Sequence, residues 1–356
     1  MPVLRNTDEG VKGKIDMGNL DLIITHYKEP FAVGKKLFDS IAMQRMVNFE
    51  NVGVILVHDG EENALPDECF EGYPFKVRQI PMKKGGVSKA RNTGLDASEA
   101  EWVMFCDFDD CFSNLFGLYM IFCAMAEGKY DTIWSCFTEE TVDGDGNLTI
   151  VHHERDWVFI HGKAHNRAYL VNNDIRFNEK LTIHEDAYFT ILTQSLCKED
   201  RIGSIKTPFY LWAWNANSVV RKDNADDYVL DTYDHLIRQR IALTQEFLDR
   251  GMYEQALSAI VKTVCDCYYD CQQVTWRDPK NLDKLHKAEN WFAAYLKKYA
   301  GYYAKADSRM ISTIANASRT RTLKKGTFFV EFETMKEWIQ HIMETAKPIP
   351  AWELNV

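Results

Sequence analysis

The stretch WVMFCDFDD at residues 102–110 limits the fold of this chain more than any other feature. Five mostly apolar residues lead directly into Asp107, Asp109 and Asp110. Because the apolar run is short and does not alternate with polar residues, it is typical of a strand buried on both faces of a parallel sheet. Ligands of open α/β sheets bind just beyond the carboxyl ends of the strands. The sequence therefore predicts an α/β fold with three carboxylates at a ligand-binding edge.

The spacing of these carboxylates favours a divalent cation. Asp107 and Asp109 are two residues apart, so they point to the same side of an extended segment. Two carboxylates this close raise each other's pKa unless a positive group lies between them. Mg²⁺ or Mn²⁺ would supply that charge and commonly brings substrate phosphates with it. A simpler alternative is that Asp109, Asp110 or Ser113 caps the helix expected to follow, since such residues are favoured at helix N-termini.

The composition narrows the partners and the compartment. The chain has 356 residues, 46% of them hydrophobic, which is enough for one large domain or two ordinary ones. Its formal net charge of −10 argues against broad non-specific binding to nucleic acid or anionic lipid. The nine cysteines show no paired framework, and no apolar run resembles a signal segment or approaches membrane-spanning length. We therefore expect a cytoplasmic protein without an integral membrane segment, with Cys265, Cys267 and Cys271 as buried thiols.

Strand and helix patterns alternate along the first two thirds of the chain, as in a doubly wound nucleotide-binding fold. Strands are expected at residues 20–25, 52–57, 75–80, 102–107, 132–137, 148–152 and 202–212. Helices are expected at residues 31–45, 88–97, 115–126, 164–170 and 187–196. From about residue 226 proline and glycine become sparse and a helical periodicity dominates. We therefore expect a polar arm at 1–18, an α/β domain at 19–224 and a mainly α-helical region at 225–356.

Five motifs occur in order along the expected α/β domain. They are THY at 25–27, VHDG at 57–60, GVSKARNTG at 86–94, FCDFDD at 105–110 and HED at 184–186. The ordered set resembles the family 2 glycosyltransferases, which are inverting enzymes of the GT-A fold, and the resemblance covers roughly residues 19–222. It implies a metal-dependent transfer of a sugar from a nucleoside diphosphate donor, typically a UDP-sugar, to an acceptor hydroxyl.

The resemblance also implies where the donor binds. Thr25 and Tyr27 would line the nucleobase pocket, and Asp59 would hydrogen-bond the base, typically uracil. Arg91 would help to hold the base end or the diphosphate. Asp107 would contact the ribose or a metal-bound water.

The same resemblance implies the chemical roles. Asp109 would bind the divalent cation, Mn²⁺ or Mg²⁺, that bridges the diphosphate. Asp186 would be the general base, with Glu185 the competing candidate. Lys84 is one of several basic side chains available to stabilise the departing diphosphate. Ser218 belongs to a segment that looks like the family's late loop, which closes over the nucleotide and contacts its phosphates.

Several alternatives stay open at this point. A sugar-phosphate nucleotidyltransferase shares the architecture, but it should have a glycine-rich loop directly after the first strand, and residues 25–30 contain no glycine. A non-catalytic GT-A-like scaffold that binds nucleotide-sugars is the other alternative. Asp59 could simply cap a turn, and Glu185 and Asp186 could be first-turn acids favoured by the helix dipole.

The acceptor is the least determined partner. A glycan, a lipid-linked glycan, a protein and a modified nucleobase all remain open, and residues 161–163 look like a segment near the acceptor. The helical region is also a candidate surface for a homo-oligomer. For the histidines near strand ends, His161 among them, a packing or surface role is the favoured interpretation.

Overall fold

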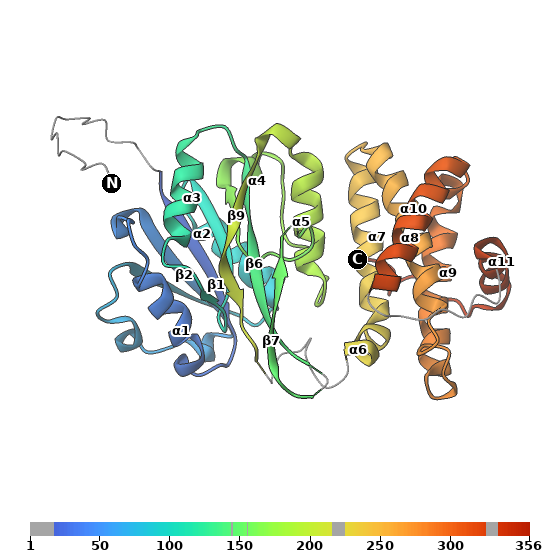
Figure 1. The fold of residues 1–356 in the computed structure, drawn as a ribbon, viewed down its shortest axis with the longest axis horizontal. Coiled ribbons are helices and arrows are strands. Elements are labelled where there is room, and N and C mark those ends of the chain that lie inside the picture. The colour runs from blue at the N-terminus through green and yellow to red at the C-terminus, as the bar shows by residue number, and fades with distance from the viewer. Residues whose placement is uncertain (1–17, 144, 155, 216–224, 325–333) are drawn as a thin grey trace, which may run out of the picture.

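The computed structural model describes residues 18–143, 145–154, 156–215, 225–324 and 334–356, and its first part forms a mixed sheet (Figure 1). The strands are β1 (Leu20–His26), β2 (Val52–Asp59), β3 (Lys76–Met82), β4 (Trp102–Asp107), β5 (Cys111–Phe112), β6 (Thr132–Val142), β7 (Leu148–His153), β8 (Lys163–Asn166) and β9 (Ile202–Trp212). Their order across the sheet is β3-β2-β1-β4-β8-β6-β9-β5, and β7 pairs with β6. Strands β1 to β4 are mutually parallel, whereas β8 is antiparallel to both β4 and β6.

Helices cover both faces of this sheet. They are α1 (Phe31–Ala42), α2 (Val87–Ala97), α3 (Gly117–Ala126), α4 (Arg167–Asn172) and α5 (Glu185–Leu196). Consecutive residues of β1 enter opposite cores: Leu22 and Ile24 pack with α1 and α3, and Ile23 packs with α2 and α5. A strand buried on both sides must be apolar at every position, which explains the unbroken apolar runs. The predicted α/β class is confirmed.

The last part of the chain is helical and has a core of its own. Its helices are α6 (Ala225–Asp231), α7 (Tyr233–Asp249), α8 (Tyr253–Cys271), α9 (Leu282–Tyr303), α10 (Ser308–Lys324) and α11 (Met335–Thr345). Ala242, Leu243 and Phe247 of α7 join the sheet core on the α5 side, so the helical region packs beside α5 (Figure 1). The three clustered cysteines of α8 are buried, as expected. The division into an arm, an α/β domain and a helical region at 18/19 and 224/225 stays a prediction.

The sequence reading differs from the structure mainly around β8. Residues 164–170 were expected to be a helix, but Lys163–Asn166 form a strand and the helix α4 begins at Arg167. The strand is short and carries lysine and histidine, so its pattern does not resemble a buried strand. It forms because β4 and β6 each supply a hydrogen-bonding edge to it. Strand β6 is also longer than expected, because it continues to Val142 to pair with β7.

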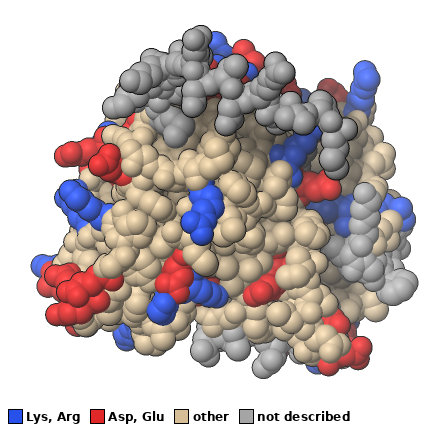
Figure 2. All heavy atoms as spheres, turned by 60° about the vertical axis from the view of Figure 1, so that its left-hand side comes forward, with Lys and Arg blue, Asp and Glu red and all other residues tan. Residues whose placement is uncertain are grey.

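The distribution of charge on the surface agrees with the expectation that the protein does not bind nucleic acid or anionic lipid broadly. On the face shown in Figure 2, basic and acidic side chains are interspersed among uncharged residues rather than gathered into one basic area. None of the helices in the described part of the chain combines the length and the apolarity that crossing a membrane requires.

The close approach of α2 to β1 should make Gly94 sensitive to substitution. A Cβ atom at Gly94 would lie 2.3 Å from Cγ2 of Ile23, a fully buried side chain with little room to move. We expect Gly94→Ala to cost about 1–3 kcal/mol of unfolding free energy, measured by urea denaturation, because the added methyl overpacks the core.

Gly301 of α9 is the matched control. A Cβ atom at this position meets no heavy atom within 4 Å. Gly301→Ala should therefore stabilise by about 0.5–1 kcal/mol, the usual gain when alanine replaces glycine inside a helix. Equal effects of the two substitutions would show that α2 does not pack on β1 as described.

Candidate active site

The carboxyl ends of the parallel strands meet at one edge of the sheet, the lower edge in Figure 1. Strand β1 ends at His26, β2 at Asp59 and β4 at Asp107. In the register of the sheet, Thr25 lies opposite both Val57 and Asp107. Residues from THY, VHDG and FCDFDD are therefore neighbours in space, as the α/β prediction required.

Arg91 joins two of the motifs through a pair of ion pairs. It lies on α2, its side chain is only 4% exposed, and its guanidinium donates to Asp107 Oδ1 and to Glu185 Oε1, both at 2.8 Å. The guanidinium also lies 5.2 Å from the ring centre of Phe177. Burial by itself would lower the pKa of Arg91, but the charges of Asp107 and Glu185 raise it above its ordinary value. Arg91 is therefore permanently charged and connects α2 to β4 and to α5.

Arg91 lowers the pKa of both carboxylates, but their net pKa shifts have opposite signs. Burial would raise the pKa of Asp107, but the charge of Arg91 outweighs it and lowers that pKa below the ordinary value. The pKa of Glu185 is raised, because burial outweighs the opposing effect of Arg91. Both groups lie at the start or end of an element, where backbone geometry holds them.

Asp186 has the pKa best suited to a general base. Burial and then the neighbouring charge of Glu185 raise its pKa to about 7, while Arg91 opposes the shift. Its Oδ1 accepts a hydrogen bond from the N–H of Ala187 at 2.7 Å. His184, the residue before α5, has φ of 65°, a left-handed conformation that is costly for a non-glycine residue. The HED motif thus forms a strained turn that presents two carboxylates at the start of α5.

A second group of side chains could hold a cation. Ligand atoms of Asp107, Asp110 and His161 lie within 4.8 Å of one another. Asp110 is fully buried and accepts hydrogen bonds from the Tyr210 hydroxyl at 2.7 Å and from the Ala213 N–H at 3.0 Å. Burial, followed by the charge of Asp107, raises the pKa of Asp110 well above its ordinary value. Two carboxylates and an imidazole fit a divalent cation such as Mn²⁺ or Mg²⁺ by the chemistry of their ligand atoms.

Asp109, the residue that sequence reasoning pairs with Asp107 at the metal, has different contacts. Its Oδ2 accepts a hydrogen bond from Asn215 Nδ2 at 2.7 Å. Burial raises its pKa, Asn215 opposes this, and the charge of Asp107 adds to it. Asp109 and Asp107 are thus close enough to interact, and the assignment of Asp109 to the metal stays a prediction. Sequence reasoning favoured a packing or surface role for His161 over a ligand role, because its position beside Asp107 depends on residues far apart in the chain.

Tyr27, predicted to line the base pocket, contacts Lys84, which is predicted to stabilise the departing diphosphate. Lys84 donates to the Tyr27 hydroxyl at 2.8 Å, and its ammonium lies 4.8 Å from the ring centre. This hydrogen bond lowers the pKa of Tyr27. Asp59 accepts hydrogen bonds from the N–H groups of Gly85 at 2.6 Å and Gly86 at 3.0 Å. Asp59 therefore fixes the loop that enters α2, and its contact with a base stays a prediction. Ser218 lies outside the described residues.

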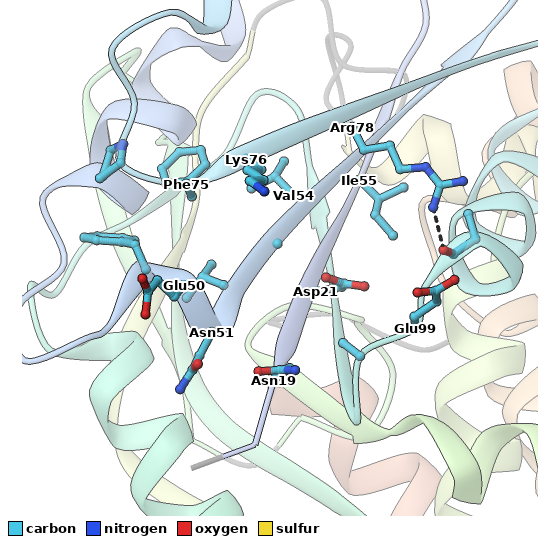
Figure 3. A pocket seen from close by; sticks show the side chains of 16 residues that line it. Asn19, Asp21, Glu50, Asn51, Val54, Ile55, Phe75, Lys76, Arg78 and Glu99 are labelled. Atoms are coloured by element: carbon cyan, nitrogen blue, oxygen red, sulfur yellow. Dashed lines mark hydrogen bonds between the residues drawn. The ribbon is translucent and has the colours of Figure 1, made fainter. Parts of the chain in front are cut away.

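A cavity of about 640 Å³ lies away from this edge, at the amino ends of β1 and β2 (Figure 3). Polar side chains such as Asn19, Asp21 and Glu99 line it, and Arg78 donates to the Ala97 carbonyl at 3.0 Å on its rim. It contains none of the residues that the motifs single out. The candidate site is therefore defined by its side chains and not by this cavity.

The fold and the carboxylate-lined edge define a GT-A glycosyltransferase fold, and solved structures agree. Residues 1–349 of TarS from S. aureus give a TM-score of 0.55 at 16% sequence identity, covering 89% of this chain and 98% of that one. A longer TarS structure gives a TM-score of 0.57 at 14% identity, covering 92% of this chain and 55% of that one. At such low identity the similarity concerns the fold.

The sequence itself gives the family. Residues 21–187, a little under half of the chain, match the model of glycosyl transferase family 2. The minor teichoic acid biosynthesis protein GgaA of Bacillus subtilis is 27% identical over 191 residues, which are 49% of this chain and 42% of GgaA. The uncharacterized glycosyltransferase EpsJ of Bacillus subtilis is 23% identical over 241 residues, 60% of this chain and 67% of EpsJ. The chain thus spans less than half the length of GgaA. The predicted family and fold are confirmed.

The two ion pairs of Arg91 make a prediction about stability. Arg91→Met should cost about 3 kcal/mol at pH 7 to 8, near the low end of the range for a broken buried pair, since Asp107 is 30% exposed. The cost should fall towards pH 5. In the variant, Asp107 and Glu185 lose the cation that favours their charged forms, so both can take up protons as the pH drops. Urea denaturation of the wild type and the variant across this pH range measures the difference in unfolding free energy.

Arg176→Met provides the comparison. Arg176 pairs with Asp96 at 2.5 Å, but their side chains are 39% and 59% exposed. This substitution should cost no more than about 1 kcal/mol. If Arg91→Met were equally mild and independent of pH, the guanidinium would not be what holds the two carboxylates together.

Proposed function

We propose that this protein is a metal-dependent, inverting glycosyltransferase that moves a sugar from a nucleoside diphosphate donor, UDP in the first instance, to an acceptor hydroxyl. The observation that carries the proposal is that two carboxylates at the same end of the sheet have pKa values shifted in opposite directions. Asp107 is held charged by Arg91, whereas the pKa of Asp186, the residue that follows Glu185 of the second ion pair, is raised to about 7. Carboxylates with pKa values pushed apart by their surroundings are typical of sites that divide charge stabilisation from proton transfer.

Asp186 takes the acceptor's proton in this proposal. Inverting transfer is an in-line displacement at the anomeric carbon, so the attacking hydroxyl must lose a proton as the new bond forms. A carboxylate whose pKa is about 7 is half ionised at neutral pH and is a stronger base than an ordinary aspartate. Glu185 is the competing candidate, but its carboxylate is engaged by Arg91 at 2.8 Å. This engagement favours Asp186.

The donor's diphosphate would lie over the end of β4. Asp107 together with Asp109, or with Asp110 and His161, would hold a divalent cation, and such a cation neutralises charge that develops on a departing diphosphate. Tyr27 would line the predicted base pocket, and Lys84, hydrogen-bonded to it, would extend from there to the diphosphate. Thr25 and Asp59 complete that pocket, since the strands that carry them are neighbours.

The relatives support UDP and a cell-surface acceptor. TarS from S. aureus has been solved in complex with UDP, and that structure gives a TM-score of 0.50 at 16% identity. GgaA acts in minor teichoic acid biosynthesis, according to its name. We therefore favour a hydroxyl of a surface-polymer glycan or polyol as acceptor over a protein or a modified nucleobase. The nine free cysteines fit a reducing compartment, the cytoplasm, and assembly through the helical region stays a prediction.

Donor binding is the first test. The protein is tested with a panel of UDP-, GDP-, CMP- and dTDP-sugars. One UDP-sugar should raise the midpoint of thermal unfolding, and only when Mn²⁺ or Mg²⁺ is present, because a ligand bound to the native state stabilises it. Asp109→Ala should abolish the cation-dependent shift if Asp109 holds the metal. His161→Gln should abolish it instead if the group of Asp107, Asp110 and His161 holds it.

The rise in the thermal midpoint must also depend on which nucleotide-sugar is added. A midpoint that rises with Mn²⁺ alone, and no further with any nucleotide-sugar, would contradict the donor site. An equal shift without a cation would contradict metal dependence and leave the glycosyltransferase assignment intact.

Asp186→Asn tests the base. The variant should bind the UDP-sugar as the wild type does and lose about 10²–10⁴-fold in kcat, because an amide cannot accept the proton. In the wild type, kcat/KM should rise about tenfold per pH unit below pH 7 and level off above it, since Asp186 must be ionised and its pKa is about 7.

Glu185→Gln is the matched substitution one residue away. It keeps the proposed base, so the rise of kcat/KM with pH should remain. Nearly normal turnover in Asp186→Asn together with a large loss of turnover in Glu185→Gln would transfer the role to Glu185.

A further inference from the structure

Beside Asp186, two neighbouring strands present a tryptophan and a buried lysine. Trp134 of β6 pairs in register with Lys163 of β8, and the Lys163 ammonium lies 4.8 Å from the Trp134 ring centre. Lys163 is only 1% exposed. Its ammonium donates to the Phe159 carbonyl and lies 3.8 Å from Asp156 Oδ1. A buried ammonium this close to a carboxylate and a carbonyl holds the chain from 156 to 159 against the sheet.

The same contacts position Trp157. Its ring lies 4.6 Å from that of Trp134, at an angle of 56°, and the residue is 39% exposed. Asp156 also accepts hydrogen bonds from the N–H of Val158 at 2.8 Å and of Phe159 at 2.6 Å, so the turn that carries Trp157 is fixed from both sides. A large aromatic ring is therefore kept partly open to solvent on a rigid support. Burying that ring would be favourable, and a ligand can do so.

Strand register places the two residues that support this ring, Trp134 and Lys163, toward the end of the sheet that carries the proposed base. Side chains of a strand alternate between faces, so Trp134 and Thr132 share a face of β6, as Lys163 and His165 do on β8. His165 on this face contacts Phe189 of α5, with ring centres 5.5 Å apart. Trp134 and Lys163 lie two residue pairs closer to the carboxyl end of the sheet, where α5 begins with Glu185 and Asp186. The charge of Asp186 also opposes the lowering of the Lys163 pKa by burial, which agrees with their proximity.

We propose that Trp157, supported by Trp134 and Lys163, is an acceptor-binding residue: its exposed ring takes the C–H face of a carbohydrate acceptor and presents a hydroxyl to Asp186. The inference rests on the proposed glycosyltransferase function and adds a residue that contacts the carbohydrate acceptor. A sugar ring or a polyol offers C–H groups to an aromatic face while its hydroxyls remain free for hydrogen bonds and for reaction. Trp157 would thus hold the acceptor without touching the donor, whose predicted contacts lie on β1, β2 and β4.

Steady-state kinetics of the full chain tests this with defined probes. The UDP-sugar from the donor panel is combined with methyl glycosides of common hexoses and with a glycerol phosphate oligomer, and hydrolysis of the donor by water is followed in parallel. Trp157→Ala should raise KM for the accepted probe about tenfold, the loss expected from one aromatic contact of up to about 1.5 kcal/mol. Donor hydrolysis and donor KM should not change. Trp157→Phe should keep acceptor KM within about threefold of wild type, which also guards against a folding defect.

Trp352→Ala is the matched control, because Trp352 is 76% exposed and is carried by the C-terminal residues beyond α11. It should leave every parameter unchanged. Acceptor KM equal to wild type in Trp157→Ala, or the same change in both alanine variants, would overturn the inference.

A measurement of binding separates this inference from the proposed function. Protein labelled with 5-fluorotryptophan is titrated first with UDP and Mn²⁺ and then with the carbohydrate probes, and Trp157→Phe identifies the Trp157 resonance. A shift of that resonance with carbohydrate, on top of bound UDP, supports the inference. UDP binding with a Trp157 resonance that no carbohydrate probe moves overturns it alone, whereas failure of UDP to bind overturns the donor proposal as well.

Discussion

The guanidinium of Arg91 connects three segments that are far apart in the sequence. It lies on α2 and bonds to Asp107 at the end of β4 and to Glu185 at the start of α5, both at 2.8 Å. A buried cation must be paired, and a buried carboxylate must be paired or neutral, so each partner depends on the other two. The contact with Arg91 lowers the pKa of Asp107, whereas burial and then the charge of Glu185 raise that of Asp186 to about 7 against the opposing effect of Arg91. The division of roles between these carboxylates therefore depends on one arginine.

Close packing of α2 on the sheet makes this arrangement geometrically possible. Gly94 lets the helix approach Ile23, because any side chain there would collide with it. Arg91 precedes Gly94 by three residues, nearly one helical turn, and so lies over the carboxyl end of the sheet. A helix held further out would leave the guanidinium short of Asp107. The spacing of the arginine and the glycine in the GVSKARNTG motif thus has a physical reason. The glycine allows the short distance from helix to sheet, and that distance lets the arginine side chain reach Asp107.

The sequence predicted the strands and motifs that depend on local residue patterns. It did not predict the features that depend on contacts between residues far apart in the chain. The unbroken apolar run before Asp107 predicted a doubly buried strand, and β4 is one. The ordered motifs predicted the family and brought Asp107 and Asp186 to one site. Strand β8 was missed because its lysine and histidine resemble a surface segment; only pairing with β4 and β6 buries them. The contacts of His161 and of the Tyr210 hydroxyl with Asp110 were not predicted for the same reason, since they span about 50 and 100 residues of chain and no spacing rule reveals them.

The charges at this edge also explain why a donor diphosphate should arrive with a cation. Four of its carboxyl groups, those of Asp109, Asp110, Glu185 and Asp186, have raised pKa values, with burial as the largest cause in each. Among the ion pairs of the described residues, the permanent cation bound to this group is Arg91, and its two bonds are taken by Asp107 and Glu185. A diphosphate placed here alone would add negative charge to a buried site that already lacks positive charge. A divalent cation reverses this balance: it lets the carboxylates ionise, and it pairs with the diphosphate at the same time. The excess of carboxylates is thus unfavourable for the protein alone and favourable for a complex of metal and nucleotide, which is the reason we expect the two to bind together.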